Sequence, residues 1–237
     1  MLRVLAPHFC AGIEFRNDVV IKAAPILSWS VGKERHELER YFERKGWKAE
    51  PLSMTTHLMV DIETLGTRPG AIIISAAFVR CADEANFVLN LSIPEQQALG
   101  MEIDPATHAW WGEQETKCPG IWQRVTENPQ SLNVALPYIS TWLQWAAGGS
   151  DDWLIWCHGA TFDCPLLDEL YRRVRLPSPW KYWQVRDTRT LYDLASINPK
   201  NFAVPPPHVA LNDALGQSRA LMASLAVIAK AHQGAAA

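Results

Sequence analysis

The feature that most constrains this chain is an apolar, strand-like run over residues 57–62 that ends in two acidic residues. Asp61 and Glu63 are spaced i, i+2, so on a β-strand both side chains point to the same face of the sheet. Carboxylates that close repel each other unless a positive charge lies between them, and a divalent cation is the usual partner. Taken alone, the pair also fits a solvated strand edge. The rest of the chain favours the metal site.

Two later segments carry groups of the same kind. Phe162 and Asp163 follow a second apolar, strand-like run over residues 154–157, and His208 and Asp213 open the last predicted helix. Hard cations such as Mg²⁺ prefer carboxylate oxygens as ligands, and a neutral imidazole can accept a proton near pH 7. The ordered set of acids with one histidine therefore predicts a metal-dependent site.

The composition bounds the class of protein. With 237 residues, the chain has room for one α/β domain and a small appendage. No segment approaches the roughly 20 uninterrupted apolar residues that a membrane span requires, and no basic-then-apolar leader begins the chain. The five cysteines are odd in number and include no C-x-x-C pair, which argues against a zinc knuckle or a disulfide scaffold. We therefore expect a cytoplasmic protein without a membrane partner.

The charge is divided unevenly along the chain, although the net value is only −3. Residues 1–53 carry nine Lys and Arg against seven Asp and Glu, whereas residues 54–237 carry thirteen against eighteen. Four of those eighteen acids belong to the predicted metal site, and two divalent ions would offset them. The mild acidity therefore does not exclude a phosphate-containing substrate.

Residues 1–50 are predicted to form a separate small unit with an α+β fold and an unknown role. The pattern predicts two short strands and a charged amphipathic helix, over 9–15, 19–26 and 34–45. Residues 48–53 are predicted as a linker to the second unit, 54–237. Because Met54 begins a segment that could start a protein by itself, we interpret the chain as a natural fusion or as a product of an upstream start codon.

The larger unit is predicted to combine a meander with alternating strands and helices. Its first strands, over 57–62, 71–79 and 87–93, are joined by short turns, which favours antiparallel pairing. The later predicted elements are strands over 154–157 and 183–186, helices over 104–111, 131–147, 165–173 and 188–195, and a last helix after the Pro205–Pro207 loop. This order predicts an α/β fold with a mixed sheet, three antiparallel strands plus parallel strands, flanked by helices. The last helix is expected to pack on the sheet through Leu211, Leu215, Ser218, Met222 and Leu225.

The ordered set of Asp61, Glu63, Asp163, His208 and Asp213 resembles the DEDDh (DnaQ-like) 3′-5′ exonucleases, whose domain has a ribonuclease H-like fold. The D-x-E, F-D and H-x-x-x-x-D motifs are weak singly but fairly specific in this order, and the resemblance covers residues 54–237. The sequence around the motifs is more narrowly similar to the ribonuclease AS-like 3′-5′ exoribonuclease group, which is common among bacteriophage and prophage proteins. The similar segments are Met59–Gly66, Trp110-Trp111, Pro179-Trp180 and Arg186–Thr190.

The resemblance implies a two-metal-ion exonuclease that releases nucleoside 5′-monophosphates from the 3′ end of single-stranded nucleic acid. It implies that Asp61, Glu63, Asp163 and Asp213 hold two divalent cations, Mg²⁺ or Mn²⁺, with Asp61 as the bridging ligand. It assigns His208 as the general base that removes a proton from the attacking water. RNA is favoured over DNA by the resemblance, while the contacts to the 2′-OH that decide this preference are not visible in a sequence.

Four further residues are expected at the substrate. In the family, the neighbourhood of Thr64 and Leu65 holds the terminal nucleotide through a backbone amide and an apolar wedge under the base, and Phe162 is placed with them. His158 departs from the family pattern, which usually has Asn there. It could donate a hydrogen bond to the substrate or fill a polar gap at the strand end. A second departure is Asn212, which replaces a common Asp.

Several alternatives stay open at this stage. A binding module without chemistry, which sequesters nucleic-acid ends or binds a partner, is the competing hypothesis to an enzyme. The cations over 172–175, with Lys181 and Arg189, either follow a phosphate backbone or lie on a solvated helix face. Most of the eleven tryptophans are expected in the core or at interfaces, and a minority could stack on bases. A homodimer and a partner for residues 1–50 are both compatible with the sequence.

Overall fold

The computed structural model describes residues 1–51 and 55–235. They form two compact units, Met1–Met54 and Thr55–Ala237, each with its own hydrophobic core. Part of the predicted linker and the predicted start at Met54 lie outside the described residues. No helix in the described ranges is long and apolar enough to cross a membrane.

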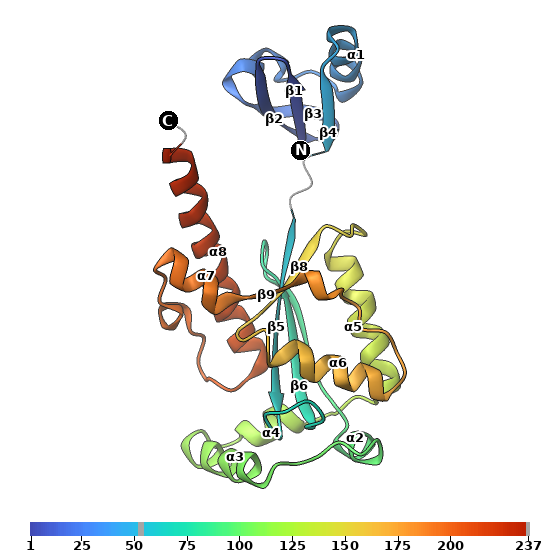
Figure 1. The fold of residues 1–237 in the computed structure, drawn as a ribbon, viewed down its shortest axis with the longest axis vertical. Helices are drawn as coiled ribbons and strands as arrows, with labels where there is room; N and C mark the ends of the chain where they lie inside the picture. The colour runs from blue at the N-terminus through green and yellow to red at the C-terminus, as the bar shows by residue number, and fades with distance from the viewer. Residues whose placement is uncertain (52–54, 236–237) are drawn as a thin grey trace. The chain divides into compact units, whose positions relative to one another are not determined.

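The N-terminal unit is a four-stranded antiparallel sheet with one α-helix (Figure 1). Its elements are β1 (Leu2–Ala6), β2 (Phe9–Arg16), β3 (Val19–Ala23), a 3-10 helix η1 (Pro25–Ser30), α1 (Arg35–Lys45) and β4 (Lys48–Pro51), with the strand order β3-β2-β1-β4. Gly46 ends α1 in the left-handed conformation, at a φ of 65°, which glycine adopts without strain. Leu38 and Phe42 of α1 pack on Val4 and Ile13 of the sheet, so the helix closes one face of it.

Two strands of this unit were not predicted. β1 was overlooked, and the prediction of a linker from residue 48 is wrong for residues 48–51, which form β4. β4 has only four residues and no apolar alternation, so its sequence carries no strand signal. It is a strand because β1 supplies the antiparallel backbone partner, from Leu2 opposite Pro51 to Leu5 opposite Lys48.

The larger unit is built on a five-stranded mixed sheet (Figure 1). Its strands are β5 (Thr56–Thr64), β6 (Ile73–Arg80), β7 (Ala85–Asn90), β8 (Trp153–Cys157) and β9 (Val185–Asp187), in the order β7-β6-β5-β8-β9. β5, β6 and β7 pair antiparallel, whereas β8 pairs parallel with β5, and β9 with β8. The predicted fold class, three antiparallel strands plus parallel strands flanked by helices, is confirmed.

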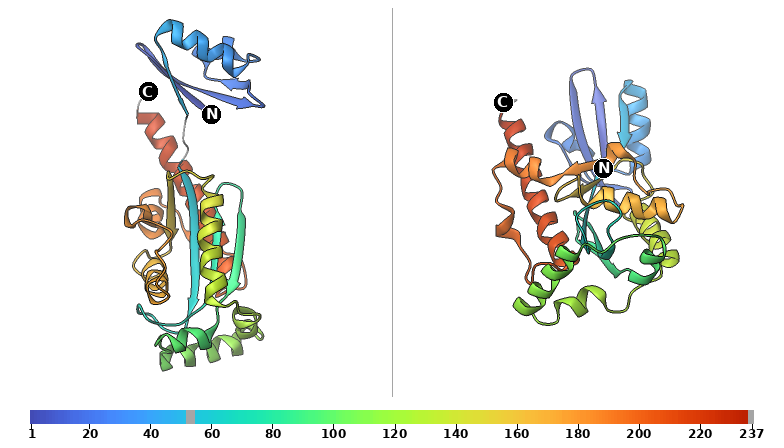
Figure 2. Two further views of the ribbon diagram at one scale, coloured as in Figure 1. Left: turned by 90° about the vertical axis from the view of Figure 1, so that its right-hand side faces the viewer. Right: turned by 60° about the horizontal axis from the view of Figure 1, so that its bottom comes forward.

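Helices cover both faces of this sheet. They are α2 (Ile93–Ala98), α3 (Pro105–Lys117), α4 (Ile121–Thr126), α5 (Leu132–Ala146), α6 (Asp163–Arg173), η2 (Tyr182–Gln184), α7 (Thr188–Ala195), η3 (Pro199–Phe202) and α8 (Ala210–Ala235). Figures 1 and 2 show α5 and α6 on one side of the sheet and α7 and α8 on the other. α2 and α4 were not predicted. α6 begins at Asp163, two residues before the predicted start at Pro165.

Alternation along β5 decides where the acidic pair lies. Leu58, Val60 and Ile62 pack into the core beneath α5 and α6, whereas Met59 packs into the core beneath α7 and α8. Since side chains alternate along a strand, Asp61 and Glu63 share the face of Met59. The acidic pair therefore lies on the face that α8 covers, at the carboxyl end of β5.

The prediction for the packing face of α8 is partly wrong. Met222, which was expected on the sheet, is 37% exposed. Of the predicted positions, Ser218 is buried, and Leu211, Leu215 and Leu225 are partly buried against the core. The fully buried positions also include Ala210, Ala214, Leu221 and Ser224, beside the predicted stripe. Small side chains let α8 lie close to β5 and β6, with which it makes many contacts, so the larger residues that mark the periodic pattern flank the contact instead.

Candidate active site

The structure brings together the five residues that the motifs single out. Asp61 and Glu63 lie at the end of β5, and Asp163 is the first residue of α6, shortly after β8. Because β5 and β8 run parallel, their carboxyl ends meet at the same edge of the sheet. Asp213 lies in the first turn of α8, and His208 two residues before that helix.

The histidine is held between an acid and an aromatic ring. The carboxylate oxygens of Glu63 and Asp213 and a ring nitrogen of His208, which could bind a metal ion, all lie within 4.8 Å of one another. The backbone N–H of His208 donates a 2.8 Å hydrogen bond to Oδ2 of Asp213, and its backbone φ of 62° lies in the left-handed region. Its imidazole meets the ring of Trp110 edge to face, with the centroids 4.8 Å apart. The hydrogen bond holds the backbone at His208, and the ring of Trp110 packs against the imidazole.

Burial and mutual repulsion destabilise the ionised forms of the carboxyl groups relative to their protonated forms. Burial, followed by the charges of the neighbouring carboxylates, raises the pKa of Asp61 well above its ordinary value and that of Glu63 to about 8. Burial also raises the pKa of Asp163 to about 7, although its backbone hydrogen bonds and the charge of Arg189 act in the opposite direction. The pKa of Asp213 is raised by burial too. A site that resists holding several carboxylates ionised together fits divalent cations, which supply the missing positive charge.

Gln217 belongs to the same site and was not found by sequence reasoning. Its Nε2 donates a 2.7 Å hydrogen bond to Oδ1 of Asp61, and the bond favours the charged form of that carboxyl. Its Oε1 is buried and has no hydrogen-bond partner in the described part of the chain. Gln217 follows Asp213 by four residues on one face of α8, and this spacing could have identified it.

A pocket of about 500 Å³ opens beside the carboxylates. Glu63, Thr64, Trp110 and Phe162 are among its walls, so two of the predicted substrate-binding residues line it. The Thr64 carbonyl accepts a 2.9 Å hydrogen bond from Nε1 of Trp111, and its hydroxyl donates to the Gly66 carbonyl at 2.7 Å. Leu65 lies in the core, with 1% of its surface exposed.

His158 lies at the end of β8 with its Nδ1 3.0 Å from the Thr188 hydroxyl. That hydroxyl donates to the Cys157 carbonyl at 3.1 Å, so Nδ1 of His158 is the donor in the pair. Burial, and secondarily the charge of Arg189, lowers the pKa of His158. These contacts connect β8 to the start of α7. They favour the alternative in which His158 fills a polar gap at the strand end.

The basic residues of the larger unit are engaged to different degrees. Arg172 and Arg173 both pair with Glu169, at 2.6 and 2.7 Å, which is the arrangement of a helix-face ion-pair network. Arg189 instead lies over Gly159, where an added Cβ would be 3.2 Å from its Nη1. Asp187 caps α7, because its carboxylate accepts from the Arg189 backbone N–H at 2.8 Å. Burial raises the pKa of Asp163 in the carboxylate site, and the charge of Arg189 acts on that acid in the opposite direction.

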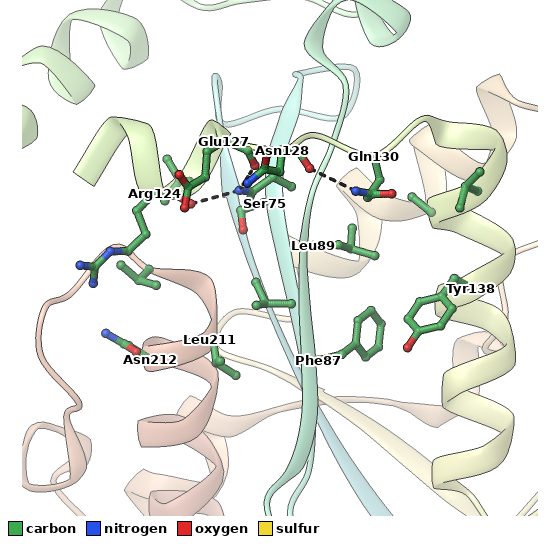
Figure 3. Close-up of a pocket in the computed structure, with 16 residues that line it drawn as sticks. Ser75, Phe87, Leu89, Arg124, Glu127, Asn128, Gln130, Tyr138, Leu211 and Asn212 are labelled. Atoms are coloured by element: carbon green, nitrogen blue, oxygen red, sulfur yellow. Dashed lines mark hydrogen bonds between the residues drawn. The ribbon is translucent and has the colours of Figure 1, made fainter. Parts of the chain in front are cut away.

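A second, larger pocket of about 700 Å³ reaches the sheet on both sides of β7 (Figure 3). Ser75, which lines it, is the cross-strand neighbour of Glu63, so the pocket borders the carboxylate site. Figure 3 shows Leu211 and Asn212 of α8 on one side of β7 and Tyr138 of α5 on the other. Arg124 and Asn128 add polar groups along the same pocket.

Two solved structures are similar to this chain. The nuclease domain of 3′hExo, described as a DEDDh family member bound to rAMP, is 12% identical with a TM-score of 0.48, over 75% of this chain and 94% of that chain. Cell-death related nuclease 4 (CRN-4) is 12% identical with a TM-score of 0.42, over 73% of this chain and 64% of that chain. No curated protein matches the chain.

The family itself is shown by a match over most of the chain. Residues 56–225 match the family described as the 3′-5′ exoribonuclease Rv2179c-like domain. The match begins at the first residue of β5 and includes all the motifs that carried the resemblance, so that resemblance is confirmed. The chain therefore belongs to the Rv2179c-like 3′-5′ exoribonuclease family and is a 3′-5′ exonuclease.

Proposed function

We propose that this enzyme is a two-metal-ion exoribonuclease, which releases nucleoside 5′-monophosphates one at a time from the 3′ end of single-stranded RNA. The observation that carries the proposal is the convergence of four carboxyl groups and His208 beside a pocket of about 500 Å³. A pocket of that volume suits one nucleotide. The family description supports RNA as the substrate class.

Asp61, Glu63, Asp163 and Asp213 would hold the cations, Mg²⁺ or Mn²⁺, with Asp61 as the shared ligand. Asp61 suits that role because the charges of the three other acids all act on it. When bound, two divalent cations act as Lewis acids and offset the negative charge that develops on the phosphate oxygens. Gln217 would keep Asp61 in the orientation that faces the site.

His208 would accept the proton of the attacking water as its oxygen bonds to phosphorus. The bond from phosphorus to the 3′ oxygen of the preceding nucleotide breaks, that oxygen takes up a proton from solvent to become a 3′-hydroxyl, and a nucleoside 5′-monophosphate is freed. The backbone hydrogen bond of His208 to Asp213 and the packing of its ring on Trp110 support this role, as does the distance of at most 4.8 Å between its ring nitrogen and the carboxylate oxygens of Glu63 and Asp213.

We also propose a homodimer formed through β7. β7 is an edge strand that pairs with β6 alone in the described sheet, and edge strands are ready templates for a second chain. Exposed apolar side chains lie beside it, namely Val88, Val134, Tyr138 and Trp145. Sedimentation velocity tests this proposal, with Tyr138→Glu as the variant expected to dissociate the dimer. A monomeric wild-type protein at micromolar concentration would refute it.

A time course on 5′-labelled single-stranded RNA and DNA of one sequence tests the proposed activity. It is run with Mg²⁺, with Mn²⁺ and with EDTA, beside the Asp163→Asn variant. We expect a ladder that shortens from the 3′ end faster on RNA, and no ladder with EDTA or in the variant. Full activity of the variant would refute the role of Asp163. Faster DNA cleavage would refute the RNA preference, and no cleavage by the wild type under any metal would leave the binding-module hypothesis.

A further inference from the structure

The N-terminal unit carries a surface pocket of about 490 Å³ between η1 and α1. Its walls are Trp29, Lys33, Glu37, Leu38, Arg40, Tyr41, Glu43 and Arg44. All of them precede residue 56, where the match to the exoribonuclease family begins. The exonuclease activity therefore gives no account of this pocket.

The spacing along α1 builds one wall of the pocket. Arg40, Tyr41 and Arg44 follow Glu37 at three, four and seven residues, which places the four side chains on one helix face. Leu38 and Phe42, by contrast, are buried in the core of the unit. The face of α1 that carries Tyr41 therefore lies at the edge of the core, where its side chains reach solvent.

The pocket contains an aromatic pair at the surface. The rings of Trp29 and Tyr41 lie with their centroids 4.7 Å apart, and Trp29 is 40% exposed. Tyr41 is supported from behind, because its ring also meets those of Phe42 and Trp47 edge to face. An indole that stays exposed on a rigid aromatic support is suited to stack on a flat ligand.

The cations that surround this pair share the pocket with two acids, Glu37 and Glu43. Lys33 and Arg44 form no ion pair with any residue in the described ranges, and Arg40 donates a long hydrogen bond, 3.4 Å, to the His36 carbonyl. Arg35, which lies outside the pocket, is by contrast committed to Asp18 at 2.7 Å. Arg44 packs over the Tyr41 ring, with its Cζ 6.0 Å from the ring centroid. None of the three cations of the pocket is paired with a carboxylate in the described ranges, so each can meet an anionic ligand.

We propose that this pocket binds single-stranded nucleic acid, with bases stacked on Trp29 and Tyr41 and phosphates held by Lys33, Arg40 and Arg44. Alternating flat rings and negative charges is the pattern that nucleic acid offers and that this surface complements. An acidic peptide would use the cations but has no need of the exposed indole. The inference rests on the proposed function in one respect: the strand bound here is the body of the molecule whose 3′ end is degraded.

Binding is measured with the full-length protein in EDTA, by fluorescence anisotropy of a 5′-labelled 20-nucleotide RNA. We expect Trp29→Ala to weaken binding about 10-fold or more, and Trp29→Phe to retain most of it. The combined Lys33→Ala, Arg40→Ala and Arg44→Ala variant should flatten the salt dependence by a slope of about 2, since each phosphate contact on a single strand contributes roughly 0.7.

The matched control exploits the two acids in the same pocket. Glu37→Gln combined with Glu43→Gln removes negative charge beside the proposed phosphates, so RNA should bind more tightly. Weaker RNA binding in this control variant would overturn the proposal, as would unchanged binding in the triple cation variant or in a folded Trp29→Ala variant. A poly-glutamate peptide that binds in preference to RNA would overturn it in favour of an acidic partner.

Substrate length separates this inference from the proposed activity. On a trinucleotide, Trp29→Ala should leave kcat/KM unchanged, whereas on a 30-nucleotide RNA the KM should rise about 10-fold with an unchanged kcat. Equal KM values for wild type and variant on both substrates would overturn the inference and leave the exonuclease intact. If the wild type has no exonuclease activity but still binds RNA in a way that depends on Trp29, the proposed function alone would be overturned.

Discussion

Nε2 of Gln217 donates a 2.7 Å hydrogen bond to Oδ1 of Asp61, and this bond links α8 to β5. Besides burial, the charges of all three other acids of the site raise the pKa of Asp61. Gln217 therefore opposes protonation of the one carboxyl group on which the repulsion of the others converges. A hydrogen bond of this kind tunes and orients a metal ligand.

Replacement of Gln217 by Leu should weaken Mn²⁺ binding and kcat/KM about 10-fold to 100-fold, because Asp61 loses its donor. Calorimetric titration with Mn²⁺ and steady-state kinetics on RNA measure the two effects. Met222→Ala, on the exposed face of the same helix, is the control and should change neither. Wild-type Mn²⁺ affinity in Gln217→Leu would contradict the positioning role.

Replacement of His208 by Ala should lower kcat about 10²-fold to 10⁴-fold, the usual contribution of a general base. Mn²⁺ binding to the carboxylates should persist, since the four acids remain. Single-turnover cleavage of labelled RNA and Mn²⁺ titration are the measurements. His36→Ala, which removes an exposed histidine of the N-terminal unit, should retain full activity. A variant at His208 that cleaves at the wild-type rate would show that another group accepts the proton.

Without divalent metal, the free energy of unfolding should fall as pH rises from about 5 to about 8. The pKa of Glu63 is raised from its ordinary 4.5 to about 8 in the folded protein, so in this window the folded state binds more protons than the unfolded state. Each proton difference makes stability decrease with pH, by more than about 1 kcal/mol in total.

Urea unfolding in EDTA at several pH values measures this dependence. Glu63→Gln should make the dependence shallower, because the amide does not titrate while Asp61 and Asp163 still do, and Mg²⁺ should restore the stability of the wild type at pH 8. A wild-type stability in EDTA that is the same at pH 5 and pH 8 would be inconsistent with the raised pKa.

Replacement of His158 by Ala should destabilise the fold by about 1 kcal/mol, because the Thr188 hydroxyl loses its donor. The catalytic rate should change little if these contacts describe its role. Thermal unfolding, with a double-mutant cycle to Thr188→Val, measures the coupling between the two side chains. A large fall in kcat/KM with unchanged stability would favour the alternative, in which His158 contacts the substrate.

Local patterns were sufficient for much of the larger unit. Alternation over β5 predicts a strand with Asp61 and Glu63 on one face, and the structure places both on the face that α8 covers. The short turns between β5, β6 and β7 predict their antiparallel order. Asp187 at the start of α7 and Gly46 at the end of α1 mark helix ends through their own backbone chemistry. Such features depend on neighbours in the sequence, which a sequence displays.

Contacts between distant segments were not visible in the same way. β4 exists because β1 pairs with it, Gln217 reaches Asp61 because α8 crosses β5, and the small residues of α8 form its packing face because the helix lies close to the sheet. Each depends on a partner far away in the chain, whose identity no local period reveals.

The sequence by itself determined the types of chemical group, their order and the family to which the chain belongs. The tertiary structure decided which groups meet: it brings four carboxyl groups together beside His208, and it places Trp29 on Tyr41 in a pocket that three cations line. The physical reason is that motifs are read along the chain, whereas burial and charge repulsion depend on distances in space. Those distances are set by the parallel pairing of β5 with β8 and by the packing of helices on the sheets.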